Sequence, residues 1–366
     1  MKKLLLVALL VAVVVAATGL WLAFWPNTPA YEGERGVRLP TRSFDAAADS
    51  LEAAGLLASR GSFELFATLT GWDQQVKPGH YRFESGASNW ALMDKIRKGL
   101  RDPITLTIPP GTRPGRMARV LRNQLGTDST AVVEALRDTA FAESLGTDVA
   151  HLHGRLLAET FEVYWTDDAR EALRRIHNRY ERFWTEEREA KARALGLSPD
   201  EVLTLASIVE WEARHPEERP RIAGVYLNRL LGRTAAGRMR LQADPTVQYA
   251  LMETDGGPMR RLLRVDYRFP HPYNTYLIDG LPPGPITNPS ESSVDAVLDN
   301  EAHDYLFFVA EPGGDGRHRF SRTATEHSQA ADEWSRWLSE QVRLRRARER
   351  AERDSLARLQ APGTTR

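Results

Sequence analysis

The pattern of apolar and polar positions begins with one long apolar run. Residues 4–25 contain no charged side chain, and as a helix they would span roughly 33 Å, about the thickness of a bilayer core. Lys2 and Lys3 precede the run, and no basic cluster follows it closely. The pattern predicts a transmembrane helix over 4–25, with residues 1–3 in the cytoplasm and the rest outside. A cleaved signal peptide is the alternative, although its apolar core is usually only about 7–15 residues long.

The next segments alternate between strand and helix patterns. After a polar linker over residues 26–35, short strands are expected at 37–39, 79–83 and 103–108, and helices at 46–57, 63–69 and 90–100. Ser43 or Asp45 can cap the first of these helices, Ser62 the second, and Ser88 the third. A small mixed α/β module is therefore predicted over residues 36–105.

Residues 106–340 have mostly helical apolar spacing, which predicts a larger α+β domain. Helices are expected at 116–125, 129–136, 168–195, 217–231, 246–252 and 333–359, and a hairpin at 305–309 and 319–321. Another helix begins at Ser198, has proline at its first position, and stops at His215–Pro216. Residues 256–288 have the glycine, proline and tyrosine content of ordered loops, and residues 341–366 form a charged C-terminal helix and tail.

Composition then narrows the chemistry. The 366 residues include 49 basic and 49 acidic side chains, so no overall charge favours nucleic acid as a partner. The chain has no cysteine, which excludes thiol catalysis, disulfides and cysteine-ligated metals. Phosphate-cradling and dinucleotide-binding glycine motifs are missing too. His151 and His153 make only a weak metal site, because no further ligands follow at metal spacing.

Residues 203–212, LTLASIVEWE, carry the strongest indication of chemistry. Glu210 and Glu212 end an otherwise apolar helix, where desolvation would raise the proton affinity of a carboxylate toward that of a general acid. They lie about 200° apart on the helix, so they cannot both face one cleft. One is a candidate acid; the other is expected to pair with a nearby arginine (Arg214, Arg219 or Arg229) or to be solvated. Structural ion pairing is the alternative for both.

Two later segments are candidate substrate contacts. Gln242 and Asp244 alternate, so they share a face if extended, although Asp244 could simply cap the helix 246–252. The segment 272–276 and the proline- and glycine-rich run 280–289 place aromatic rings beside amides, a combination that suits sugar binding. A packed loop without a ligand is the alternative.

Taken together, these segments resemble the endolytic murein transglycosylases, the MltG or YceG-like family. The chain has ASIVEWE at 206–212, VYLNRL at 225–230, LQADPTV at 241–247, YNTY at 273–276 and GLPPGPITNP at 280–289, in the family's order. Ala243 departs from the hydroxyl residue that the family usually has. The resemblance extends from the N-terminal helix to about Trp337.

The resemblance implies that Glu212 is the catalytic acid and that residues 36–105 form a LysM-like module ahead of a YceG-like catalytic domain, 106–340. It implies cleavage of the bond between N-acetylmuramic acid and N-acetylglucosamine inside peptidoglycan strands, forming a 1,6-anhydro end without a metal or organic cofactor and ending strand elongation. A partnership with peptidoglycan synthases at the cytoplasmic membrane follows from it as well. Candidate substrate-binding or supporting residues are Gln242, Asp244, Tyr273, Asn274, Thr275 and Asn288.

Two other functions are compatible with the residues. A scaffold that binds peptidoglycan without cleaving it, and brings a synthase to the wall, would not need Glu212. A hydrolase that adds water would need a second carboxylate, with Glu210, Asp244 or Glu159 as the base.

Overall fold

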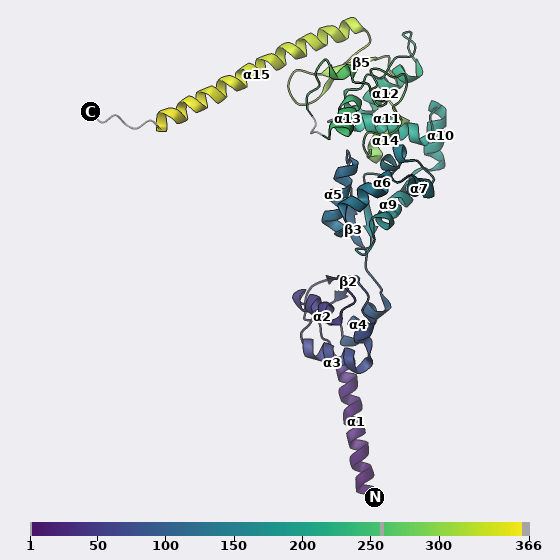
Figure 1. The fold of residues 1–366 in the computed structure, drawn as a ribbon, viewed down its shortest axis with the longest axis vertical. Helices are drawn as coiled ribbons and strands as arrows, with labels where there is room; N and C mark the ends of the chain where they lie inside the picture. Colours follow the sequence, from purple (N-terminus) through teal and green to yellow (C-terminus); the bar gives the residue numbers. More distant parts are fainter. Residues whose placement is uncertain (1, 257–259, 361–366) are drawn as a thin grey trace, which may run out of the picture. The chain divides into compact units, whose positions relative to one another are not determined.

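The structure is a computed structural model that describes residues 2–256 and 260–360. The chain divides into two compact units that are interleaved in sequence; Figure 1 labels their helices and strands. The first contains Met1–Thr107, Gly115–Ala135 and Thr160–Ile176. The second contains Ile108–Pro114, Leu136–Glu159 and His177–Arg366.

The N-terminal module lies in the first unit and follows the long apolar helix α1. Its elements are α1 (Lys2–Phe24), β1 (Glu34–Leu39), α2 (Phe44–Ala53), α3 (Arg60–Thr70), η1 (Trp72–Gln75), β2 (Gly79–Glu84) and α4 (Asn89–Lys98). Strands β1 and β2 pair antiparallel, with Val37 opposite Tyr81. Their alternate side chains point into a core that the helices close, as a period of two predicts. The helix α3 begins earlier than expected, because Ser59 rather than Ser62 caps it.

The first unit also contains a strand pair that the sequence revealed only in part. Strand β3 (Ile104–Thr107) was expected, and it pairs antiparallel with β4 (Thr160–Val163), which was not. With only four residues, β4 offers too short an alternation to stand out from its surroundings. Around this pair lie α5 (Pro114–Leu125), α6 (Ser129–Arg137) and the first half of α9 (Ala169–Phe183).

The second unit is mainly helical and is built around α11. Its elements include α7 (Thr139–Ser144), α8 (Val149–Arg155), α10 (Glu186–Leu195), α11 (Pro199–Glu212), η2 (Pro216–Glu218), α12 (Arg219–Leu231), α13 (Asp244–Asp255), η3 (Asp266–Arg268), α14 (Glu291–Leu298), β5 (Phe307–Ala310), β6 (His318–Ser321) and α15 (Ala324–Gln360). The expected hairpin is confirmed: β5 and β6 pair antiparallel, with Phe307 opposite Ser321.

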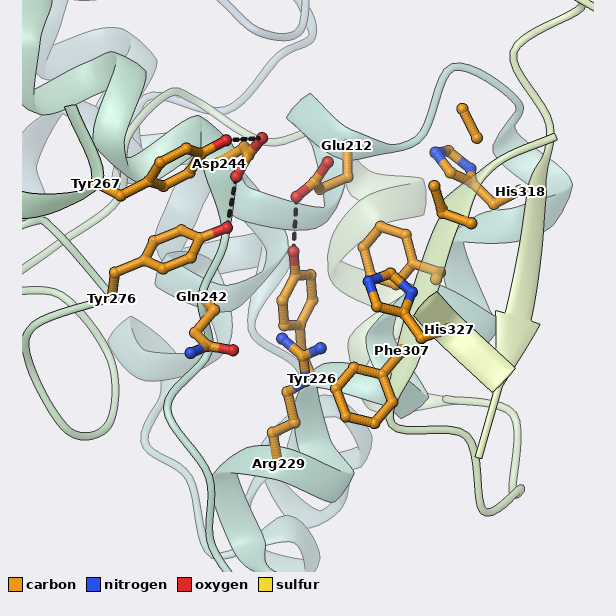
Figure 2. Close-up of a pocket in the computed structure, with 13 residues that line it drawn as sticks. Glu212, Tyr226, Arg229, Gln242, Asp244, Tyr267, Tyr276, Phe307, His318 and His327 are labelled. Atoms are coloured by element: carbon orange, nitrogen blue, oxygen red, sulfur yellow. Dashed lines mark hydrogen bonds between the residues drawn. The ribbon is translucent and has the colours of Figure 1, made fainter. Parts of the chain in front are cut away.

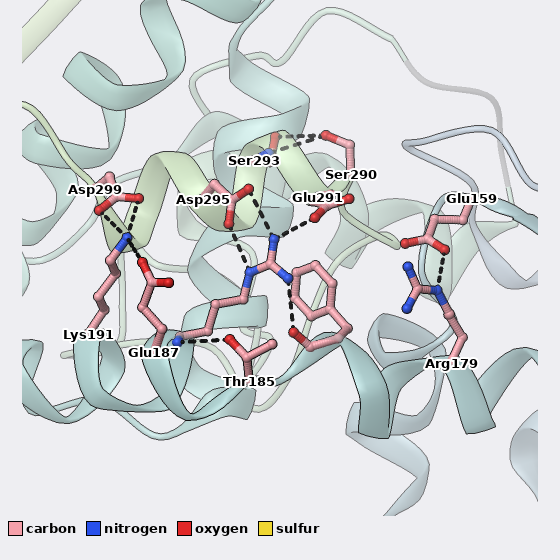
Figure 3. Close-up of polar contacts among 12 residues, drawn as sticks. Glu159, Arg179, Thr185, Glu187, Lys191, Ser290, Glu291, Ser293, Asp295 and Asp299 are labelled. Carbon is pink, nitrogen blue, oxygen red and sulfur yellow. Dashed lines mark hydrogen bonds and ion pairs between the residues drawn. The ribbon is translucent and has the colours of Figure 1, made fainter.

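The helix expected at 168–195 is in fact two helices, α9 and α10. Thr185 ends the continuity, because its side chain accepts a hydrogen bond from the Arg188 backbone and caps a new helix. Figure 3 shows how α10 is then held against α14, with the Lys191 ammonium between Asp299 and Glu187. The apolar spacing alone could not reveal this break, because α9 is strongly amphipathic whereas α10 has only a weak apolar face that does not mark where a new helix begins.

The fold class agrees with the expectation in its main features. The described residues form a helix-rich α+β protein with an N-terminal apolar helix. The LysM-like character of the module and the expected limits 26–35, 36–105, 106–340 and 341–366 stay predictions from the sequence.

Candidate active site

Helix α11 carries both candidate glutamates out of the core of the second unit. Ser198 and Glu201 form a reciprocal capping box at its start, with Pro199 at the first position. From Val202 to Val209 every side chain is buried. The helix is therefore hydrophobic all round and rigidly packed, so the two glutamates at its end have fixed positions.

Glu210 faces inward and is part of the scaffold. Its carboxylate accepts from the Arg219 guanidinium at 2.9 Å, from the Ser290 backbone at 3.0 Å and from the Ser293 hydroxyl at 2.7 Å. The Ser290 hydroxyl donates to it too. Only 7% of the side chain is exposed. Of the arginines expected as partners, Arg219 is the one that pairs with it, and these bonds join α11 to the starts of α12 and α14.

Glu212 points the other way, into a pocket of about 480 Å³ (Figure 2). The two glutamates thus serve different sides of the helix, as their spacing predicted. The residues that line the pocket are Glu212, Tyr226, Arg229, Gln242, Asp244, Tyr267, Tyr276, Phe307, Phe308, Val309, Ala310, His318 and His327. A pocket of this size with many hydroxyl, carboxylate and aromatic groups suits a carbohydrate better than an apolar ligand.

The environment of Glu212 raises its pKa to about 7. Desolvation is the largest cause, and the negative charge of Asp244 adds to it. Two groups act in the opposite direction: the Tyr226 hydroxyl, which donates to Oε1 at 2.6 Å, and the Arg229 guanidinium. Near neutral pH about half of such carboxyl groups would carry a proton, as a general acid requires.

One wall of the pocket holds Asp244 between two tyrosines. The Tyr276 hydroxyl donates to Oδ1 at 2.7 Å, and the Tyr267 hydroxyl donates to Oδ2 at 3.2 Å. Asp244 is the first residue of α13, whose cap position is Ala243, and no side chain caps the helix. The alternative interpretation of Asp244 as a capping aspartate is therefore wrong. Its carboxylate is turned toward the pocket by tyrosines from a different loop.

The same wall contains a strained backbone. Gln242 has φ of 50°, and no other non-glycine residue in 2–256 and 260–360 has a positive φ. Its backbone N–H donates to the Thr275 carbonyl at 3.1 Å. A left-handed glutamine costs free energy, and such strain is concentrated at functional sites where the surroundings enforce it. Here it places Gln242 and Asp244 on the same pocket.

The buried side chain of Arg229 connects two segments that line the pocket. Its guanidinium donates to the backbone carbonyls of Leu306, just before β5, and of Leu241, just before Gln242. Burial lowers its pKa, and the Phe307 ring lies 5.2 Å from it. This buried cation thus connects α12 to β5 and to the Gln242 segment, and its charge acts on Glu212.

The remaining expected site residues do not line this pocket. Tyr273 packs on Tyr249 at 4.7 Å, and Asn274 donates to the carbonyls of Tyr267 and Phe269. The Thr275 hydroxyl accepts from the Ala243 backbone at 2.9 Å. Asn288 accepts from the Thr112 backbone at 2.6 Å and donates to the Leu156 carbonyl. These four side chains hold the loops that present Gln242, Asp244 and the tyrosines.

Other expected candidates lie elsewhere. Glu159 pairs with Arg179 at 2.8 Å (Figure 3) and does not line the Glu212 pocket. His151 pairs with Asp148, whereas His153 bonds the Thr112 carbonyl, so the two rings make separate local contacts. Of the carboxylates considered as a second catalytic group, only Asp244 shares the pocket with Glu212.

Eight polar or aromatic residues of the pocket were not among the site residues predicted from the sequence: Tyr226, Arg229, Tyr267, Tyr276, Phe307, Phe308, His318 and His327. Tyr226 and Arg229 lie in the VYLNRL motif and Tyr276 in YNTY, so these motifs contained a usable signal. His318 is the first residue of β6 and His327 lies near the start of α15, where no local pattern distinguishes a pocket residue from a surface histidine.

The fold and site define a helix-rich α+β protein with a single core helix that delivers one protonatable glutamate to a polar, tyrosine-lined pocket. The chain belongs to the YceG-like family, whose profile matches residues 39–333. This confirms the resemblance inferred from the motifs.

Curated relatives have related names. An endolytic murein transglycosylase of Bacillus subtilis (strain 168) is 27% identical over 307 residues, which cover 80% of this chain and 82% of the relative. An endolytic murein transglycosylase of Streptococcus pneumoniae is 26% identical over 293 residues, covering 72% of this chain but 51% of that longer protein. A crystal structure of a protein described as YceG-like from Listeria monocytogenes matches with a TM-score of 0.56 and 26% identity, covering 82% of this chain and 99% of that one.

Proposed function

We propose that this protein is a membrane-anchored endolytic transglycosylase of peptidoglycan. It cleaves the bond between N-acetylmuramic acid and N-acetylglucosamine within nascent strands, leaves a 1,6-anhydro end, and so terminates strand elongation beside the synthases. The names of its relatives support this reaction class. The observation that carries the proposal is the raised pKa, about 7, of Glu212 in a pocket lined by sugar-compatible groups.

In the proposed mechanism Glu212 acts first as acid and then as base. The protonated carboxyl donates its proton to the glycosidic oxygen as the bond to C1 of the muramoyl residue breaks. The resulting carboxylate then takes the proton from the C6 hydroxyl of the same residue while that oxygen attacks C1. The ring closes, no water is consumed, and Glu212 returns to its protonated form.

Neighbouring groups suit both forms of Glu212. Desolvation and Asp244 favour the acid before the cleavage, whereas the Tyr226 hydroxyl and Arg229 stabilise the carboxylate after it. In this mechanism the negative charge of Asp244, which lines the same pocket as Glu212, would stabilise the developing oxocarbenium ion. Both oxygens of Asp244 are already bonded to tyrosines, which favours this electrostatic role over activation of a water molecule.

We also propose that α1 is a retained anchor with its N-terminus in the cytoplasm. By length and composition α1 could cross a membrane, a test that a signal sequence near the N-terminus also passes. Its last turn, however, belongs to the module: Leu22 is 8% exposed within the module core. The Asn89 side chain donates to the Leu22 carbonyl at 2.9 Å and accepts from Asn27 at 2.6 Å. Cleavage directly after α1 would remove the packing of Leu22 and its hydrogen bond to Asn89, which supports retention.

The test is digestion of uncross-linked glycan strands by the full-length protein in detergent micelles, with the product ends identified by mass spectrometry. Internal cuts with 1,6-anhydromuramic ends are expected from the wild type and should disappear in Glu212→Gln. Glu217→Gln is the matched control, because it removes an exposed glutamate that pairs with Arg317 outside the pocket. Reducing ends would instead indicate hydrolysis with Asp244 as the second carboxylate. Strand binding without any cleavage would indicate a scaffold.

A further inference from the structure

The pocket has a second wall opposite Asp244, formed by the hairpin and the start of α15. Figure 2 shows His318, His327 and Phe307 on this side, Asp244 and its two tyrosines on the other, and Glu212 between them. A strand bound at Glu212 would lie between the two walls. The proposed reaction assigns no role to the second wall.

His318 is held more firmly on this wall than a surface histidine would be. Its Nδ1 lies 3.0 Å from Glu218 Oε2, and its backbone N–H donates to Oε1 of the same carboxylate at 3.0 Å. The Phe308 ring packs edge-on against the imidazole at 5.3 Å. Exposed fractions are 12% for the His318 side chain and 8% for Glu218. Three contacts therefore determine the position and orientation of the ring.

The contact with Glu218 also determines which ring nitrogen meets a ligand. A carboxylate only accepts hydrogen bonds, so Nδ1 must carry the proton in the pair. In the neutral ring Nε2 then has a free lone pair. Within residues 2–256 and 260–360 no hydrogen-bond partner of Nε2 is seen, and His318 lines the pocket. Nε2 is thus an acceptor available to a hydroxyl donor inside it.

We infer that His318 binds the glycan directly, through a hydrogen bond from a sugar hydroxyl to Nε2, and that Glu218 is a positioning residue that holds the imidazole in this tautomer. This inference rests on the proposed function for the identity of the ligand and extends the site to the hairpin. Glu218 directly precedes α12, whose Tyr226 bonds Glu212. The same helix therefore orients the acid and the hydroxyl acceptor.

A purely structural role is the competing explanation, because the Glu218–His318 pair also ties β6 to the start of α12. Two substitutions separate the roles. The amide of His318→Asn occupies the position of Nδ1 and can still bond Glu218, but it does not reach the pocket. The amide of His318→Gln occupies the position of Nε2 and reaches the pocket, but gives up the bond to Glu218.

Binding is measured with fluorescently labelled, uncross-linked strands and full-length protein in micelles, on a Glu212→Gln background that prevents cleavage. His318→Asn is expected to weaken binding about ten-fold, the loss of one hydrogen bond, and His318→Gln should bind several-fold better than His318→Asn. If His318→Gln binds the strand no better than His318→Asn does, the inference is overturned. Thermal unfolding of each variant shows whether the fold is kept.

Glu218→Gln tests the positioning role without a change in shape. Its carbonyl oxygen can still accept from the His318 backbone, which turns the amide group toward Nδ1 and makes Nε2 the protonated nitrogen. Binding should fall as in His318→Asn; binding at the parent level would overturn the role of Glu218. His151→Asn is the matched control, since His151 also pairs with a carboxylate through Nδ1, but outside the pocket.

The two hypotheses fail in different ways. If the wild type binds strands but never cleaves them, the proposed reaction is wrong, whereas the comparison of His318 variants still decides the binding role. If neither the wild type nor the Glu212→Gln protein binds a strand, both are wrong. Cleavage with equal affinities for all His318 variants contradicts the further inference alone.

Discussion

Replacing Tyr226 with phenylalanine should raise the pKa of Glu212 further. The Tyr226 hydroxyl donates to Glu212 Oε1 at 2.6 Å and stabilises the carboxylate, which lowers the pKa from the value that burial alone would produce. A hydrogen bond to a charged group is worth about 1.5–3 kcal/mol, and one pKa unit corresponds to about 1.4 kcal/mol. The pKa should therefore rise from about 7 by roughly one to two units. The phenyl ring keeps the buried shape.

The direction of the pH effect follows from the proposed role of Glu212 as the acid. Only the protonated form can donate, so kcat/KM declines as pH rises through this pKa. In Tyr226→Phe the decline should move to higher pH. Asp244→Asn removes a negative charge that raises the pKa of Glu212, so there the decline should move to lower pH.

The assay is kcat/KM for strand cleavage by the full-length protein, measured from about pH 5 to about pH 10, a range that brackets the ionisation expected in both variants. The pH at which kcat/KM declines should move up in Tyr226→Phe and down in Asp244→Asn. If the decline stays in place in Tyr226→Phe, or if both variants move in the same direction, the assignment of Glu212 as the titrating acid is refuted. Circular dichroism at each pH separates this result from unfolding.

Three further predictions concern stability. The pKa of Glu212 is about 7 in the folded protein and 4.5 ordinarily, so the native state loses stability as pH rises between these two values. Glu212→Gln removes this loss. Denaturant unfolding should therefore show the variant more stable than the wild type at about pH 8, by up to about 3 kcal/mol, and equal to it below about pH 4.5. Glu210→Ala breaks a buried ion pair with Arg219 and should cost about 3–5 kcal/mol; an unchanged melting temperature would contradict its scaffold role. In Gly284→Ala the added Cβ would lie 2.5 Å from the Ala150 carbonyl oxygen, so urea unfolding should show a loss of about 1–3 kcal/mol. Gly115→Ala is the control and should lose less than that, because Gly115 has open space around its Cβ and lies in the helix α5 without a positive φ.

Local patterns were sufficient for most elements of the fold. The capping box at Ser198, the hairpin β5–β6 and the strands of the module could all be predicted, because caps, alternation and turns act over a few residues. The predicted helix boundaries were wrong where a single capping side chain decided where a helix begins. Thr185 splits a predicted helix, and Ser59 begins a helix that Ser62 was expected to cap. In both places neighbouring residues offered equivalent local choices.

The spacing of Glu210 and Glu212 determined by itself that they serve opposite sides of one helix, because helical periodicity is a local property. Only the tertiary structure shows the physical reason why Glu210 belongs to the scaffold and Glu212 to the pocket, the choice that the family resemblance had implied. Arg219 pairs with Glu210 and the serines at the start of α14 hydrogen-bond to it, whereas Tyr226, Arg229 and Asp244 act on Glu212. These partners come from elements far apart in sequence, so no local pattern contains them. The same reason explains why His318 was missed: its role depends on Glu218, 100 residues away along the chain.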